Sequence, residues 1–220
     1  MFFAEITLPL ALQDFMLVIF FAIGLFFVGK MVARESAICG NLAFFGGFLI
    51  TLGGFFKVCW KLLVATTGTD VAWLNNSLFV LMACGFICLA WALWRSRKEN
   101  KAAIFWLVPL VLIILTLGVA GYFAFVKEMR VWFFILLGAT TLFNLAVSFQ
   151  LIFRAAKNKL WLTVALFVFN LICIFTLARM GDQTVTLQWI KQGINTFSQG
   201  SFALAAYLLA RHTARDAATR

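Results

Sequence analysis

Long apolar stretches alternate with short polar ones along the whole chain. A run of about 20 apolar residues with few charges is long enough to cross the hydrocarbon core of a bilayer as one helix. The pattern predicts seven such helices, over residues 12–33, 38–66, 72–94, 103–126, 131–153, 159–179 and 186–210. The polar stretches between them are short, which leaves no room for a soluble domain. We therefore expect residues 1–220 to form a single all-α transmembrane domain, a seven-helix bundle.

The seventh predicted helix is more polar than the others. Gln188, Gln192, Asn195 and Gln199 fall within an arc of about 60° at the helical period of 100° per residue, with Lys191 beside them. An unpaired amide is too costly in hydrocarbon for this stripe to face lipid. The amides either join helices by hydrogen bonds or line a polar cavity. Four amides and a lysine exceed what helix association requires, which favours the cavity.

The second predicted helix carries glycines and a lysine on one face. Gly46, Gly47, Gly53 and Gly54 lie within an arc of about 120°. Glycines in membrane helices permit close approach of a neighbour or mark a kink. Lys57 lies on the same face, and a lysine inside a membrane span normally faces the bundle interior and is a candidate functional residue. This helix is therefore predicted to form the cavity wall that faces the seventh helix.

The candidate ligand is anionic at one end. Asp14 is the only acidic residue expected at the depth of Lys57 and Lys191, so a ligand is expected to supply the negative charge that these lysines need. Lys61, one turn nearer the membrane surface, is expected to snorkel instead. The predicted binding residues are Lys57, Lys191, Gln188, Gln192, Asn195 and Gln199, with Asn144 and Asn170 on neighbouring helices.

Composition and charge agree with a membrane protein. The chain is 64% hydrophobic and 12% charged, with a formal charge of +10. The loops and terminus on the side of the C-terminus hold twelve Lys and Arg and three acidic residues, a net of +9, whereas the other side holds six and five, a net of +1. Because cytoplasmic loops hold the Lys and Arg excess, the N-terminus is predicted outside a cell (inner or plasma) membrane and the C-terminus inside. The basic residues are thus topology signals and not a nucleic-acid surface.

The third and seventh predicted helices align without a gap, with Trp73 on Trp189. An interfacial tryptophan and a terminal arginine are common to membrane helices of the same direction, and this accounts for the alignment slightly better than a duplication does. The alternative is a pair of parallel three-helix repeats over 12–95 and 131–211, with 103–126 as a linker helix. This 3+1+3 plan resembles SWEET-type transporters and microbial rhodopsins in helix count and orientation alone. The chain has neither the Pro-Gln pair of the first family nor a mid-depth lysine in its seventh helix, as the second requires.

Most enzymatic chemistry is excluded by the residues present. The single histidine, His212, lies in the C-terminal tail, and the five cysteines all fall within predicted helices. No pair of acidic residues lies within the membrane, and no glycine-rich phosphate-binding loop occurs. We expect no enzyme activity, no cofactor and no metal site.

The sequence therefore favours a carrier for a small anionic or amphipathic molecule. A ligand-binding sensor and a structural subunit of a membrane complex are the alternatives. The expected partners are the lipid bilayer and a small-molecule or lipid ligand, with no nucleic acid, and the sequence is compatible with a homo-oligomer or another membrane protein as partner. On the carrier hypothesis, Lys57→Gln and Lys191→Gln should weaken binding more than Lys61→Gln.

Overall fold

The structure of the chain, a computed structural model, describes residues 8–97, 106–181 and 184–218, with side chains up to residue 215. Within these ranges every regular element is helical. The helices are α1 (Leu8–Glu35), α2 (Ala37–Thr67), α3 (Ala72–Arg95), α4 (Leu107–Gly121) with its short π-helical continuation η1 (Tyr122–Val126), α5 (Val131–Lys157), α6 (Trp161–Arg179) and α7 (Val185–Ala218). The helical character of the seven predicted segments is confirmed within the described residues, whereas the start of the predicted 103–126 helix lies outside them.

Six of the described helices are long and apolar enough to cross a bilayer: α1, α2, α3, α4 with η1, α5 and α6. Helix α7 has 34 residues but does not reach the same apolar content. Large apolar side chains are exposed over much of the surface, as expected where lipid is the solvent. The helices indicate a multi-pass membrane protein.

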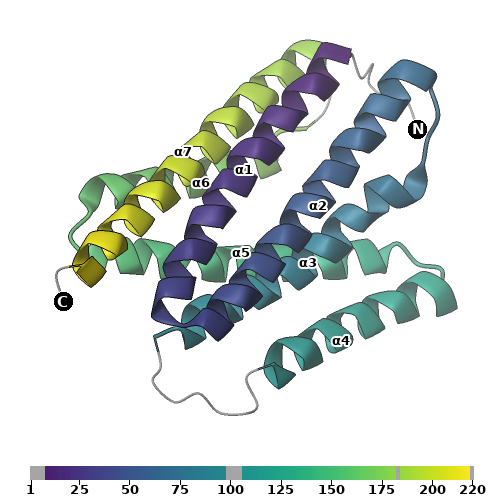
Figure 1. Cartoon of the computed structure of the whole chain (residues 1–220). Coiled ribbons are helices and arrows are strands. Elements are labelled where there is room, and N and C mark those ends of the chain that lie inside the picture. Colours follow the sequence, from purple (N-terminus) through teal and green to yellow (C-terminus); the bar gives the residue numbers. More distant parts are fainter. Residues whose placement is uncertain (1–7, 98–105, 182–183, 219–220) are drawn as a thin grey trace.

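Six helices form a closed ring, and the seventh lies outside it. Around the ring, α1 packs on α2, α2 on α3, α3 on α5, α5 on α6, α6 on α7, and α7 returns to α1. Helix α4 packs against α3 and α5 from outside (Figure 1). The first three and last three helices are therefore two contiguous arcs, an arrangement that leaves the predicted sequence repeat untested.

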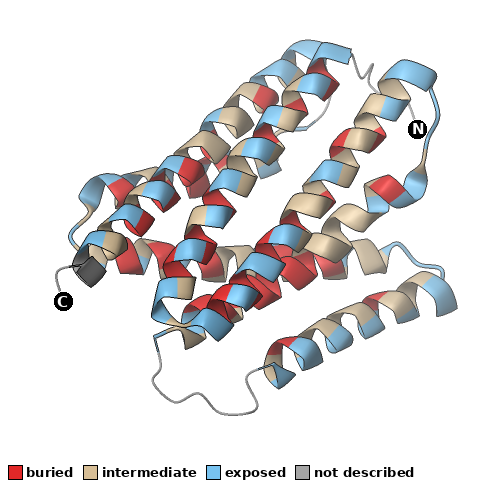
Figure 2. Ribbon diagram, in the orientation of Figure 1, coloured by how far each residue is buried: buried red, intermediate tan, exposed pale blue. Residues whose placement is uncertain are grey.

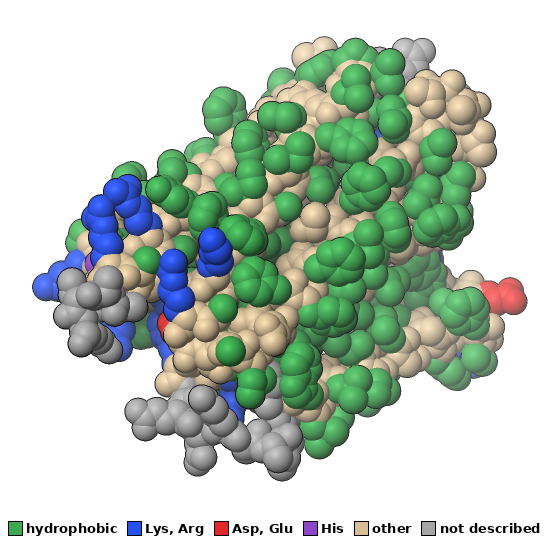
Figure 3. All heavy atoms as spheres, viewed as in Figure 1, with side chains coloured by type: hydrophobic (Ala, Val, Ile, Leu, Met, Phe, Trp, Pro, Cys, Tyr) green, Lys and Arg blue, Asp and Glu red, His purple; other side chains and the backbone are tan. Residues whose placement is uncertain are grey.

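The ring has two ends, which we name after residues of α1. The Asp14 end holds the first turns of α1 and the end of α2, and the Glu35 end holds the last turns of α1 and of α7. On the face shown in Figure 3, Lys and Arg side chains gather at the Glu35 end, near the C-terminus. This distribution agrees with the sequence, in which the Lys and Arg excess lies on the side of the C-terminus.

Aromatic side chains fill the middle of the ring. Phe21 of α1 lies with its ring centroid 5.2 Å from that of Phe202 of α7 and 6.3 Å from that of Phe86 of α3. Phe202 also contacts Phe167 of α6, at 5.9 Å between centroids. Phe86, Phe167 and Phe202 are buried, and buried residues cluster on the inward faces of the helices (Figure 2). This cluster joins the two arcs across the centre.

Helices α2 and α3 approach most closely at a pair of glycines. A Cβ added at Gly46 would lie 2.6 Å from the carbonyl oxygen of Gly85, and one added at Gly85 would lie 2.6 Å from that of Gly46. Gly53 also faces α3, where a Cβ would lie 3.1 Å from the carbonyl oxygen of Leu78. Half of the predicted glycine stripe thus serves helix packing.

Candidate ligand pocket

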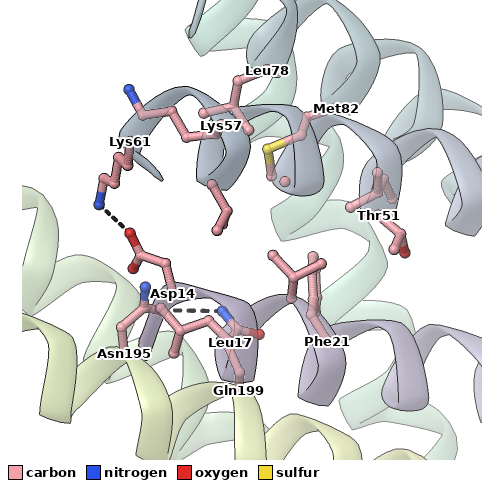
Figure 4. A pocket seen from close by; sticks show the side chains of 14 residues that line it. Asp14, Leu17, Phe21, Thr51, Lys57, Lys61, Leu78, Met82, Asn195 and Gln199 are labelled. Carbon is pink, nitrogen blue, oxygen red and sulfur yellow. Dashed lines mark hydrogen bonds and ion pairs between the residues drawn. The ribbon is translucent and has the colours of Figure 1, made fainter. Parts of the chain in front are cut away.

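A pocket of about 230 Å³ lies between α1, α2, α3 and α7, toward the Asp14 end (Figure 4). Its apolar lining includes Phe21 of the central aromatic cluster and Met82 of α3. Figure 4 shows Phe21 and Thr51 on the side of the pocket away from Lys61. The polar lining residues are Asp14 from α1, Thr51, Lys57 and Lys61 from α2, and Asn195 and Gln199 from α7.

Asp14 is the centre of a buried polar network that joins three helices. Asp14 is 6% exposed. Its carboxylate forms an ion pair with Lys61 of α2 and accepts a hydrogen bond from the side-chain amide of Gln192 of α7. A buried charge is stable only when it is paired and hydrogen-bonded. The network therefore fixes α2 and α7 to α1, which lies between them in the ring.

Lys57 is held on the other side of the pocket, toward α3. Its ammonium donates a hydrogen bond to the side-chain oxygen of Asn75 and lies 4.3 Å from the ring centroid of Trp60. The Trp60 indole in turn donates to Asp70 at 2.8 Å. In Figure 4 the Lys57 side chain extends away from Asp14. Lys57 and Lys61 therefore line the same pocket, but Lys57 is held by α3 and Lys61 by α1.

Helix α7 contributes two amides directly to the pocket. The amide nitrogen of Gln199 donates to the side-chain oxygen of Asn195 at 3.4 Å. The Gln199 side-chain oxygen is buried and has no hydrogen-bond partner among the described residues. A buried acceptor without a partner carries a desolvation cost of about 1–3 kcal/mol, which a donor group on a ligand would remove. Gln199 is therefore placed to recognise a polar group.

The other predicted residues lie elsewhere. Asn170 of α6 is 4% exposed and donates to the backbone oxygen of Ser198 at 2.9 Å and to its hydroxyl at 2.8 Å. That pair joins α6 to α7, which is the role of an interhelical hydrogen bond. Asn144, Gln188 and Lys191 are half-buried and do not line this pocket. The amide stripe thus divides between helix association and the pocket.

The role of Lys61 differs from the expectation. The sequence suggested a snorkelling residue near the membrane surface, whereas its side chain is only 25% exposed and pairs with Asp14 across the pocket. The spacing of Lys57 and Lys61 puts both on one helix face and does not decide which of them meets α1. The signal that pointed to the site is Asp14 itself, since an acidic residue inside a membrane span is a functional candidate by default.

A second buried charge, Arg154 of α5, lies at the Glu35 end. One guanidinium nitrogen donates to both carboxylate oxygens of Glu35, at 2.8 and 2.9 Å, and the other to the backbone oxygen of Leu93 and the hydroxyl of Ser96, each at 2.6 Å. Arg154 is 4% exposed. Arg154 directly follows the predicted helix 131–153 and so counted among the loop charges, although its contacts join α1, α3 and α5.

Comparison of the chain with protein-family models, with curated proteins and with solved structures gave no match. Within the described ranges, no three His, Cys, Asp or Glu side chains are grouped closely enough to hold a metal ion. The pocket and its charges are therefore the features of the described residues that indicate a function.

Proposed function

We propose that the protein is a carrier, without enzyme activity, that binds a small anionic or amphipathic molecule in the pocket at the Asp14 end. The observation that supports this most is the polar lining, which carries two ammonium groups and one carboxylate. The lining charges have a positive balance, which favours an anionic group. Interhelical hydrogen bonding alone would not require this set of charges around an open volume.

The order of the pocket, the aromatic cluster and the Arg154–Glu35 contact along the ring also favours a carrier over a structural role. The pocket is separated from the Glu35 end by the aromatic cluster around Phe21 and Phe202, and then by the Arg154–Glu35 contact. A carrier needs a binding site inside the bundle with a barrier on one side that can be exchanged for a barrier on the other. The two arcs of helices are the units that would move against each other.

The direction of access follows from the charge asymmetry. With the Lys and Arg excess at the Glu35 end in the cytoplasm, the pocket would open toward the outside of a cell membrane. In that orientation the Arg154–Glu35 contact is the cytoplasmic barrier.

Uptake of octyl sulfate into proteoliposomes tests the proposal. We expect protein-dependent uptake of this anion and none of octyltrimethylammonium, which has the same chain and the opposite charge. Lys57→Gln and Lys61→Gln should each raise the half-saturating concentration about tenfold, because a hydrogen bond to a charged group contributes about 1.5–3 kcal/mol and 1.4 kcal/mol is a factor of ten. Lys191→Gln should have a smaller effect because Lys191 does not line the pocket.

Lys157→Gln is the matched control, since Lys157 is exposed at the Glu35 end of α5. Binding of octyl sulfate without uptake would favour the ligand-binding sensor. Absence of both binding and uptake would reject the pocket as a ligand site and favour the structural subunit.

A further inference from the structure

A second hollow runs along the outer side of the α1–α2 pair. It has a volume of about 190 Å³ and is lined by Ala22, Leu25 and Phe26 of α1 and by Phe44, Gly47, Phe48 and Thr51 of α2. Phe26, Phe44 and Phe48 are 48%, 36% and 61% exposed, so this hollow faces the lipid side of the ring. We refer to it as the α1–α2 groove. Apart from Thr51, its lining side chains are apolar.

The groove continues the polar pocket. Thr51 lines both. On α1 the pocket ends at Phe21 and the groove begins at Ala22. On α2 the groove is lined by residues 44–51 and the pocket by residues 50–61, so the groove lies nearer the Glu35 end. The charged pocket and the lipid-facing groove therefore adjoin at Thr51, along the seam between α1 and α2.

Two glycines of α2 lie along this seam. Gly47 lines the groove and Gly54 lines the pocket, and both face α1. A Cβ at either position would lie 3.3 Å from a side-chain carbon of α1, Leu25 for Gly47 and Val18 for Gly54. No backbone atom of α1 lies within 4 Å of these added carbons, unlike the Gly46 contact with α3. Each glycine therefore faces a side chain of α1 and not its backbone, and a larger residue at either position would fill the seam.

The polar groups of the seam do not oppose an alkyl chain. The Thr51 hydroxyl donates to the backbone oxygen of Gly47 at 2.8 Å, so it is already satisfied. In the pocket, Lys57 and Lys61 outnumber the single carboxylate of Asp14. The pocket is also smaller than the roughly 300–1,000 Å³ typical of sites that enclose a whole ligand. This volume suits a head group, with the rest of the molecule in the groove.

We infer that the ligand is a single-chain amphiphile with an anionic head group, which reaches the pocket sideways from the bilayer through the α1–α2 seam. The head group contacts Lys57 and Lys61, and the chain lies in the groove between Phe26, Phe44 and Phe48. One narrow groove lined by one row of residues from each helix accommodates one chain. This inference rests on the proposed function and adds the ligand class and the route.

Photo-crosslinking in proteoliposomes with hexadecyl sulfate that carries a diazirine in its chain tests the route. We expect adducts on residues 22–26 and 44–51, mapped by mass spectrometry, and a roughly tenfold loss of these adducts in Lys61→Gln, because the head group loses a charged hydrogen bond. Adducts on the lipid-facing surface of α4, at 110–115, are the internal reference and should not change. Gly47→Leu should abolish the groove adducts by filling the seam, whereas Gly118→Leu on α4, where a Cβ meets nothing within 4 Å, should not.

The outcomes separate the route from the proposed function. Adducts spread evenly over the lipid-facing surface and unchanged by Lys61→Gln would overturn the α1–α2 route. Octyl sulfate uptake that still depends on Lys61 would then leave the carrier intact, with access from water. Loss of Lys61 dependence in both assays would overturn both proposals. If Gly47→Leu fails to fold, the comparison of the unmodified protein with Lys61→Gln decides alone.

Discussion

Two buried charges, Asp14 and Arg154, lie near opposite ends of the ring, and each is bound by two other helices. In the pair of Arg154 and Glu35, the two members differ in how far they are buried. The partner of Arg154 is Glu35, whose side chain is 33% exposed, whereas the Arg154 side chain is 4% exposed. Removing one member of such a pair is costly when the charge that remains is buried. Removing Glu35 and removing Arg154 should therefore change the free energy of unfolding by different amounts.

We expect Glu35→Ala to destabilise the protein more than Arg154→Met does. The first variant leaves a buried guanidinium without its counter-charge, at a cost of about 3–5 kcal/mol. The second leaves a carboxylate that water can reach and should cost clearly less. Unfolding of the purified protein in mixed micelles, followed by circular dichroism, measures both, with Lys157→Ala as the surface control. Equal losses would mean that the Arg154 charge is not desolvated.

At the scale of the helices, the polar side chains of α7 are accommodated in the bundle because neighbouring helices bind them. Its neighbours α1 and α6 receive its polar side chains: Gln192 bonds to Asp14 of α1, and Ser198 accepts from Asn170 of α6. Asn195 and Gln199 face the pocket. The helix thus exposes few of its amides to lipid, which compensates for its low apolar content. Helix α4 is the opposite case, since it is apolar and packs from outside against α3 and α5.

The close approach of α2 and α3 gives a prediction at the same scale. Gly46→Ala should lower the free energy of unfolding by about 1–3 kcal/mol, because the added Cβ overlaps the Gly85 carbonyl and the helices must separate. Gly118→Ala on α4 is the matched control. It has open space and should be neutral or stabilising by up to about 1 kcal/mol, since Ala replaces Gly in a helix interior.

The same unfolding assay measures both glycine variants. A loss of stability in Gly118→Ala equal to that in Gly46→Ala would show that the backbone contact between α2 and α3 has no special cost. A Gly46→Ala protein as stable as the unmodified one would show that the two helices can move apart freely.

At the scale of the whole molecule, the charge asymmetry predicts which end of the ring faces which compartment. The Glu35 end carries the Lys and Arg excess that marks a cytoplasmic surface. The pocket lies toward the Asp14 end, so the orientation also decides from which side a ligand arrives. Because all seven helices run alternately between the two ends, one labelled position at each end is sufficient to establish the orientation.

We expect a cysteine at Thr69 to react with a membrane-impermeant maleimide on intact cells and a cysteine at Lys157 to react only after the cells are opened. Thr69 is exposed in the loop after α2, and Lys157 is exposed at the end of α5. The native cysteines lie within helices and are buried or half-buried, which gives a low background. The reverse pattern of labelling would invert the topology and place the pocket on the cytoplasmic side.

The sequence by itself determined the seven helices, because a membrane helix satisfies its backbone hydrogen bonds within one segment and its length is set by the bilayer. It also identified polar residues that avoid lipid, since the helical period is local. Which partner each of these meets was decided by tertiary structure. Lys57 and Lys61 share one face of α2, yet Lys57 bonds to Asn75 of α3 and Lys61 to Asp14 of α1. The order of helices around the ring and their mutual tilt set this choice, and neither is encoded in the spacing of residues along one helix.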